Sequence, residues 1–147
     1  MNNPTFRPYQ PRDLIACLGL FDDNCPESFA PNERAEYETF LANHAATYEV
    51  CVADGAVVGA YGLQPRNAAA WDLRWIIVAR RTRRSGTGTA ILERVRADLT
   101  SRGVRTLHIA ASHVSAPFFA RFGAKEITTT PDGWGPGMHR IDMEIAL

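Results

Sequence analysis

The sequence predicts an α/β fold, in which strands and amphipathic helices alternate along the chain. Residues 71–78 are rich in aromatic and β-branched residues, which is typical of a strand. A helix is expected downstream, because apolar residues recur there at helical spacing: Ile91, Leu92, Val95 and Leu99. A further apolar run at 106–110 indicates a second buried strand. A strand, a helix and another strand in succession are typical of a sheet with helices packed on it.

The N-terminal third predicts a short strand and two helices. Thr5–Arg7 is expected to form the first strand. One face of the first helix is marked by apolar residues at helical spacing: Leu14, Cys17, Leu18 and Phe21. A second helix is expected after Pro31, with Asn32 as its N-cap. Its inward-facing residues are Tyr37, Phe40 and Leu41.

The remaining elements complete an ordered series. Residues 48–53 and 57–63 predict two strands joined at Asp54-Gly55, a dipeptide that favours a tight hairpin turn. After the strand at 106–110 we expect a short helix at 116–121, a strand at 125–129 and a closing strand at 140–146. The predicted order is β-α-α-β-β-β-α-β-α-β-β. No repeat, low-complexity tract or linker interrupts it, so we expect one domain over residues 1–147.

Composition and charge narrow the class of protein. The chain of 147 residues is 46% hydrophobic and 22% charged, as in ordinary globular proteins, and its formal net charge is zero. A neutral chain has no general attraction for polyanions, which argues against nucleic-acid binding. The sequence contains neither a signal peptide nor an apolar stretch of membrane-spanning length, so we expect a cytoplasmic protein that does not act at a membrane. The three cysteines have no CxxC spacing, which predicts reduced thiols and no metal site.

A basic, glycine-containing turn lies between the strand at 71–78 and the following helix. Its arginines are Arg80, Arg81, Arg83 and Arg84, and its glycines are Gly86 and Gly88. Glycines allow a ligand to approach closely and the first N–H groups of a helix lack partners, so the turn predicts a phosphate-binding site. A Walker A loop is excluded because no lysine follows the glycines, and a dinucleotide fingerprint because position 91 is isoleucine. The alternative is a solvated basic turn whose glycines only start the helix.

Residues 83–88 (Arg-Arg-Ser-Gly-Thr-Gly) match the Gln/Arg-x-x-Gly-x-Gly/Ala signature, and through it the chain resembles the GNAT superfamily of acyl-CoA-dependent N-acyltransferases. The predicted order of elements is also that of the GNAT fold. Two more segments are similar to GNAT sequences: residues 112–123, and a predicted loop at 132–138 that resembles one in bacterial small-molecule acetyltransferases. The resemblance implies a mixed, mostly antiparallel twisted sheet of about six or seven strands with about four helices, splayed at the central parallel strands.

The resemblance also implies acetyl-CoA as the cosubstrate. Amides at the start of the helix would hold the pyrophosphate, and a backbone N–H near Ile77 or Val78 would polarise the thioester carbonyl. The residues implicated are Ile76, Ile77, Val78, Arg83, Arg84, Ser85, Gly86, Thr87, Gly88, Thr89 and Phe119. Relatives often have a tyrosine at the position of Phe119, which protonates the departing thiolate. Phenylalanine cannot donate a proton, so Phe119 is expected to pack on the pantetheine arm while water serves the thiolate.

An amine acceptor arrives protonated and needs a base, for which two residues are candidates. Asp72 lies where several relatives carry a catalytic carboxylate, and the alternative is an ion pair with Arg74. Strand alternation is expected to separate two sets of side chains: Asp72, Arg74, Ile76 and Val78 on one face and Leu73, Trp75 and Ile77 on the other. His113 follows the strand at 106–110 and titrates in a useful range, with a loop histidine bonded to backbone as the alternative.

The acceptor groove implied by the resemblance lies between the first helix pair and the last hairpin. Glu27, Phe29 and Trp134 are expected to line it, although Glu27 is also explained as a turn residue without a ligand. The expected function is transfer of an acetyl group from acetyl-CoA to a primary amine, with a small molecule as the favoured acceptor, by direct attack in a ternary complex. The alternative, kept open by Phe119, is an acyl-CoA-binding sensor or regulatory module without turnover. Dimers are frequent in the superfamily, which makes a homodimer an option.

Overall fold

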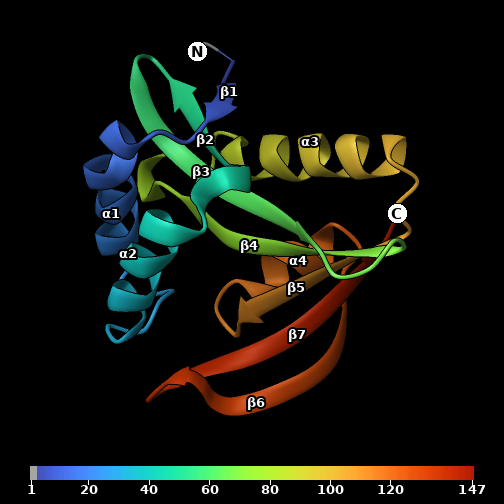
Figure 1. The fold of residues 1–147 in the computed structure, drawn as a ribbon. Helices are drawn as coiled ribbons and strands as arrows, with labels where there is room; N and C mark the ends of the chain where they lie inside the picture. Colours follow the sequence, from blue (N-terminus) through green and yellow to red (C-terminus); the bar gives the residue numbers. More distant parts are fainter. Residues whose placement is uncertain (1–2) are drawn as a thin grey trace.

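The computed structural model describes residues 3–147, which form a seven-stranded sheet with helices on both faces (Figure 1). The strands are β1 (Thr5–Pro8), β2 (Tyr48–Ala53), β3 (Ala56–Pro65), β4 (Ala70–Val78), β5 (Thr106–Ser112), β6 (Lys125–Gly135) and β7 (Met138–Ala146). The α-helices are α1 (Leu14–Asp23), α2 (Glu33–Asn43), α3 (Thr87–Ser101) and α4 (Ala116–Arg121). Single helical turns are η1 (Pro11–Asp13), η2 (Ala45–Thr47) and η3 (Arg80–Thr82). The predicted fold class and order of elements are confirmed.

The sheet is opened in its middle by the divergence of two strands. The strand order is β1-β2-β3-β4-β5-β7-β6, antiparallel except between β4 and β5. These two pair only from Ala70 to Leu73, opposite Thr106 to Ile109. Beyond that point β4 continues to Val78 and β5 to Ser112 without pairing to each other (Figure 1). The predicted splay of the central parallel strands is therefore confirmed.

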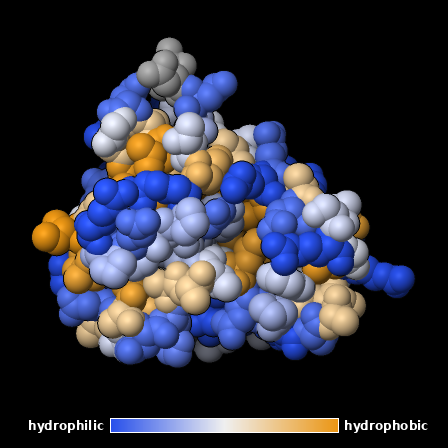
Figure 2. Space-filling model, turned by 45° about the horizontal axis from the view of Figure 1, so that its top comes forward, coloured by the Kyte–Doolittle hydropathy of each residue, from blue (hydrophilic) through white to orange (hydrophobic). Residues whose placement is uncertain are grey.

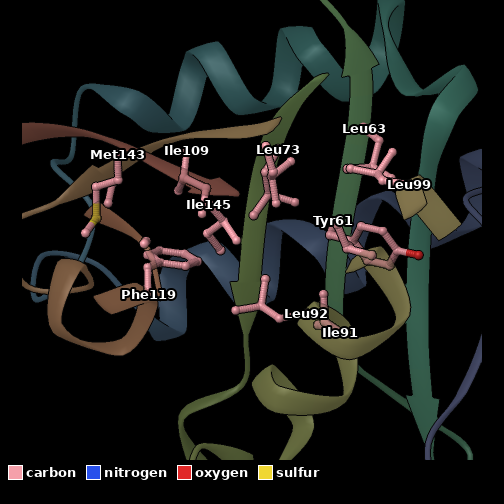
Figure 3. Close-up of a cluster of buried hydrophobic side chains, with 14 of the residues drawn as sticks. Tyr61, Leu63, Leu73, Ile91, Leu92, Leu99, Ile109, Phe119, Met143 and Ile145 are labelled. Atoms are coloured by element: carbon pink, nitrogen blue, oxygen red, sulfur yellow. The ribbon is translucent and has the colours of Figure 1, made fainter. Parts of the chain in front are cut away.

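Helices α3 and α4 cover one face of the sheet through an apolar cluster. The residues predicted for the inner face of α3 are all buried in it: Ile91, Leu92, Val95 and Leu99. Figure 3 shows Phe119 of α4 pointing into the same cluster as Leu73 and Leu92. This packing fixes the start of α3 and the whole of α4 beside the diverging strands.

Helices α1 and α2 cover the opposite face with a second cluster that is rich in aromatic rings. Its largest fully buried side chains are Phe21, Tyr37 and Tyr48. The inward-facing residues predicted for α2 are buried as expected. On α1 the predicted face packs on this cluster, with Leu14 half-buried and the other three residues buried, and Leu20 is buried in addition. α1 packs against both α2 and β3, so its buried face is wider than a single stripe.

A β-bulge at Trp75 overturns the predicted alternation of β4. Ile77 lies opposite Ala60, but Arg74 lies opposite Gly62, so β4 has one more residue than β3 over this stretch. Trp75 itself has a left-handed backbone with φ of 47°. As a result Leu73, Ile76 and Val78 pack in the cluster under α3, whereas Trp75 and Ile77 pack in the cluster under α1 and α2. The expected grouping of Ile76 and Val78 with Asp72 is therefore wrong beyond Arg74.

The hairpins differ from the prediction only at the C-terminal end. The turn between β2 and β3 is formed by Asp54 and Gly55 as predicted, both with positive φ. The predicted loop at 132–138 is not a loop, because β6 extends to Gly135 and β7 begins at Met138. A register shift within residues 130–135 makes this long pairing irregular. The tip of the β6–β7 hairpin therefore extends past the end of β5 (Figure 1).

The surface has no single dominant apolar region on the face shown in Figure 2, where apolar residues form separate patches among polar ones. The large apolar side chains that are most exposed are Ile15, Val114 and Ile127. Within residues 3–147, no helix is both long enough and apolar enough to cross a membrane.

The packing of α3 predicts a large stability cost for truncating its inner face. Leu99 is completely buried, so Leu99→Ala should lower the free energy of unfolding by about 2–5 kcal/mol, through lost transfer energy and the cavity left behind. Urea unfolding followed by circular dichroism measures this change. Ile15→Ala is the control, because Ile15 is 84% exposed and its truncation should change stability by less than about 0.5 kcal/mol. Equal losses in the two variants would contradict the assigned packing.

Candidate functional site

A cavity of about 990 Å³ lies where β4 and β5 diverge. Its lining comes from the two strands, from α2, from the start of α3, from α4 and from the β6–β7 hairpin. The cavity thus reaches both the glycine-containing turn and the groove beside α2. This continuity brings a candidate phosphate site and a candidate acceptor site into one space.

The turn before α3 leaves several backbone N–H groups without helical partners. Gly86 is the N-cap of α3 and has φ of 86°, a conformation that favours glycine. The first helical bond runs from Ala90 N–H to the oxygen of Gly86, so the N–H groups of Thr87, Gly88 and Thr89 have no acceptor inside the helix. A Cβ on Gly88 would lie 2.9 Å from the ring of Phe118, so only glycine permits this close approach of α4. These amides and the helix dipole together make a candidate anion site.

The arginines of the turn are divided between protein contacts and solvent. Arg80 and Arg83 both bind the carboxylate of Glu27, at 2.7 and 3.2 Å. Arg83 also donates to Asn24 and to Ser28 in the loop between α1 and α2. Arg81 and Arg84 are exposed and form no ion pair with any residue from 3 to 147. Arg81 and Arg84 are thus the arginines of this turn left available for a ligand.

The backbone of Val78 points towards the gap between β4 and β5. Ala79 donates its N–H to Val58 at 2.8 Å, and Val78 lies opposite Gly59. Bonded and non-bonded pairs alternate along antiparallel strands, so the backbone groups of Val78 point away from β3. The carbonyl oxygen of Val78 indeed accepts the side-chain N–H of Asn24 at 3.0 Å. The N–H of Val78 faces the same side, from which β5 has diverged.

Buried tyrosines hold the bulge that sets this orientation. The hydroxyl of Tyr48 donates to the carbonyl oxygen of Trp75 at 2.6 Å, and the hydroxyls of Tyr37 and Tyr48 are 2.8 Å apart. Burial raises the pKa of both tyrosines, so both stay neutral and able to donate. The indole of Trp75 is also packed against rings, with centroids 4.8 Å from Tyr37 and 6.2 Å from Phe29. Trp75 lines the cavity from this fixed position.

Glu33 is a cavity residue that the sequence prediction missed. Its side chain is buried, with the residue 3% exposed, and its carboxylate accepts the N–H of Ala30 at 2.8 Å. Burial, with a smaller contribution from the charge of Glu36, raises the pKa of Glu33 to about 7, despite the bond from Ala30. The sequence did contain a sign that Glu33 is buried, because Glu33 precedes the apolar residues Tyr37 and Phe40 by one and two helical turns. It therefore occupies the buried stripe of α2.

The two predicted base candidates have different surroundings. Asp72 lines the cavity, and its carboxylate accepts N–H groups of Arg66 at 2.8 and 3.0 Å. The alternative ion pair with Arg74 is not formed, because Asp72 pairs with Arg66 instead. His113 does not line the cavity and is exposed. Its Nδ1 accepts the backbone N–H of His139 at 3.2 Å, which is the backbone-bonded alternative.

The predicted acceptor residues are only partly brought together. Phe29 and Trp134 line the cavity, but Glu27 does not, because it is bound to the two arginines. The indole N–H of Trp134 donates to Ala111 in β5 at 2.9 Å. Asn32 is at the N-cap of α2 but makes no capping bond; its amide donates to the oxygen of Trp134 at 2.8 Å. The tip of the β6–β7 hairpin is thereby tied to the start of α2.

The other predicted cofactor residues surround the cavity in two groups. Ile76, Ile77, Val78, Arg83, Gly88 and Phe119 line it directly. Ser85, Gly86, Thr87, Thr89 and Arg84 belong to the adjoining turn and first helical turn. Phe119 is buried in the cluster under α3 as well as lining the cavity. Within residues 3–147, no group of three or more His, Cys, Asp or Glu side chains could hold a metal ion.

Comparison with known proteins gives one family and a shared fold. Residues 17–147 match the family model described as an acetyltransferase (GNAT) domain. No curated protein matches the sequence significantly. Among solved structures, a GNAT-family protein from Desulfovibrio desulfuricans is 24% identical, with a TM-score of 0.78 over 98% of this chain and 99% of that one.

The names of two similar structures state which molecule the enzyme acetylates. The ribosomal-protein-S18-alanine N-acetyltransferase of Escherichia coli is 21% identical, with a TM-score of 0.77 over 98% of this chain and 94% of that one. An aminoglycoside 6'-N-acetyltransferase, complexed with coenzyme A, is 16% identical, with a TM-score of 0.73 over 97% of this chain and 96% of that one. One acceptor is a protein and the other a small molecule, so the fold alone does not identify the acceptor.

The raised pKa of Glu33 predicts that stability falls as the pH rises. Its ordinary value is 4.5 and its value in the folded protein about 7, so the unfolded state loses this proton first. The free energy of unfolding should therefore decrease by about 3 kcal/mol between pH 4.5 and 7 from this group. Urea unfolding at a series of pH values measures the decrease. It should disappear in Glu33→Gln and persist in Glu36→Gln, an exposed neighbour on the same helix; its persistence in Glu33→Gln would contradict the assignment.

Proposed function

The chain belongs to the GNAT acetyltransferase family, and on that premise we propose that it transfers an acetyl group from acetyl-CoA to a primary amine. The observation that carries this proposal is that the anion site at the start of α3 and the N–H of Val78 adjoin one cavity, which continues to an acidic group at α2. A binding site for a phosphate-bearing thioester and a site for an amine are then continuous.

The residues at the start of α3 fit the coenzyme. The N–H groups of Thr87, Gly88 and Thr89 can donate to pyrophosphate oxygens, as they point out of the helix without acceptors. Arg81 and Arg84 can add charge, since neither is engaged by a carboxylate. The pantetheine arm would pass between β4 and β5, against Phe119. The coenzyme, when bound, supplies the acetyl group as a thioester.

The chain's own groups act on the reacting atoms in three ways. The N–H of Val78 donates to the thioester oxygen as negative charge develops there, which is worth several kcal/mol in a site closed to water. The carboxylate of Glu33 accepts the proton of the attacking amine. The new C–N bond forms as the C–S bond breaks, and the departing thiolate takes a proton from water because Phe119 cannot donate one.

Glu33 is a better base than Asp72 for a physical reason. A general base works best when its pKa is near the working pH, and burial raises the pKa of Glu33 to about 7. The Oδ1 of Asp72 already accepts two hydrogen bonds from the guanidinium of Arg66, so the negative charge of this carboxylate has a positive partner. We assign Asp72 to holding Arg66 at the cavity wall.

The phosphate-turn assignment predicts a selective loss of coenzyme binding. Gly86→Val places a side chain on a left-handed residue, which distorts the amides that follow, and should weaken acetyl-CoA binding about tenfold or more by calorimetry. Gly103→Val is the matched control, since Gly103 has φ of 76° and an equally open surrounding at the other end of α3. The control should lose comparable stability and keep its affinity. Retained affinity in Gly86→Val would refute the assignment.

The base assignment predicts a pH-dependent loss of rate. With a simple primary amine, the ratio of wild-type kcat to Glu33→Gln kcat should rise from about two at pH 5, where about 1% of Glu33 is ionised, to about 100 above pH 8, because only the wild-type gains an ionised base. Asp72→Asn should give a smaller loss that does not change with pH. The reverse pattern would move the base to Asp72. Coenzyme binding without turnover of any amine would instead indicate a sensor module.

A further inference from the structure

The cavity contains one half-buried positive charge that no acid neutralises. Three of its arginines are paired: Arg66 with Asp72 at 2.8 Å, Arg83 with Glu27 at 3.2 Å and Arg140 with Asp142 at 3.0 Å. Arg74 also lines the cavity, but among residues 3–147 it has no carboxylate within ion-pair distance. Arg121 is unpaired too, but it is exposed on α4 and lies over Phe118, beside the turn at Gly88.

The contacts of Arg74 fix its position without neutralising it. Its guanidinium donates to the side-chain oxygen of Gln64 at 2.5 Å and lies 5.6 Å from the centre of the Phe40 ring. Both contacts are uncharged. A guanidinium has five N–H donors, so most remain available to a ligand. Partial burial strengthens its attraction for an anion, and a planar guanidinium can bind a carboxylate or a phosphate through two parallel bonds.

Negative charge lies further along the wall of the cavity to which Arg74 belongs. Glu33 and Glu36 line the cavity at the beginning of α2, while Phe40 lies about 10 Å beyond Glu33 and about 6 Å beyond Glu36 along the helix. The wall between them is aromatic, because Trp75 packs between Phe29 and Phe40, with ring centres 6.2 and 6.3 Å away. The wall is therefore acidic at one end, apolar in the middle and basic at Arg74.

The start of α2 and the tip of the β6–β7 hairpin are joined beside the cavity, next to Trp134, which lines it. The amide of Asn32 is bonded to the backbone of Trp134, and a Cβ on Gly135 would lie 2.8 Å from the Cβ of Ala30. The hairpin tip and the segment that leads into α2 are thus in direct contact at the edge of the cavity. An extended peptide laid across this edge would have to break that contact, whereas a small molecule would not.

We propose that the acceptor is a small zwitterion, with a primary amine at the acidic end of the wall and a carboxylate or phosphate bound by Arg74 at the other. This inference rests on the proposed acetyl transfer for the role of the amine, but the binding of the anionic group stands independently. An apolar spacer of several bonds separates the two charges and lies against the aromatic wall. A polyamine is disfavoured, because its second cation would meet Arg74.

Matched pairs of acceptors test the proposal. The kcat/KM of the wild-type is measured for ω-amino carboxylates of increasing chain length, for ω-aminoalkyl phosphates and for n-alkylamines of the same lengths. One anionic series should exceed the alkylamines by about tenfold or more at its best length, and the better series identifies the anion. Arg74→Gln should remove this preference by raising KM for the anionic acceptors. It should leave kcat, the alkylamine KM and the coenzyme affinity unchanged.

Control variants and a binding measurement distinguish failure of the Arg74 anion site from failure of the proposed acetyl transfer. Arg74→Lys should restore part of the preference, and Arg105→Gln, an exposed arginine, should have no effect. Calorimetry on the protein with coenzyme A bound measures binding of the anionic acceptor, an ω-amino carboxylate or ω-aminoalkyl phosphate, without turnover. Binding that depends on Arg74 but no acetylation of any amine would overturn the proposed function and support the anion site. Equal kcat/KM for both kinds of acceptor, or a preference that survives Arg74→Gln, would overturn the anion site while acetyl transfer stands.

Discussion

The left-handed backbone of Trp75 is the constraint on which the site depends. A non-glycine residue in this conformation costs on the order of 1–3 kcal/mol, so it persists only where its surroundings fix it. Here the hydroxyl of Tyr48 holds its carbonyl, and rings from α2 and from the preceding loop hold its side chain. The bulge reverses the faces of the residues that follow. It sends Ile76 and Val78 under α3 and leaves the indole as a wall of the cavity.

The divergence of β4 from β5 converts this local distortion into a site. Parallel pairing stops at Leu73, so the backbone of Val78 faces a gap instead of a neighbouring strand. The same gap receives the start of α3 on one side and the start of α2 on the other. A candidate anion site, the backbone N–H of Val78 and the buried carboxylate of Glu33 then share one cavity, although they come from segments far apart in the sequence. The proposed transfer reaction follows from that convergence, and the proposed acceptor from the charges that remain unpaired within it.

Most of the fold could be predicted from sequence, because it depends on periodicities that single residues do not disturb. The inner face of α3 and the hairpin at Asp54 are examples. The bulge could not be predicted, because one extra residue in β4 leaves the apolar composition of the strand unchanged. The bulge is also held by a hydrogen bond from Tyr48, which is distant in the sequence. Glu27 was predicted for the acceptor because it is acidic, but the turn arginines engage it. Glu33 was missed although it lies on the buried stripe of α2, where an acid is unusual enough to suggest a function.

In the proposed reaction, the bulge at Trp75 aims the N–H of Val78 at the thioester oxygen. The most direct measurement is the amide resonance of Val78 in ¹⁵N-labelled protein, titrated separately with acetyl-CoA and with coenzyme A. Both ligands should shift the amides of Thr87 and Gly88, whereas only acetyl-CoA should produce a large downfield shift at Val78, because coenzyme A has no thioester carbonyl to accept the bond. Equal shifts at Val78 with the two ligands, or none with either while the α3 amides respond, would contradict the proposed bond from Val78 to the thioester oxygen.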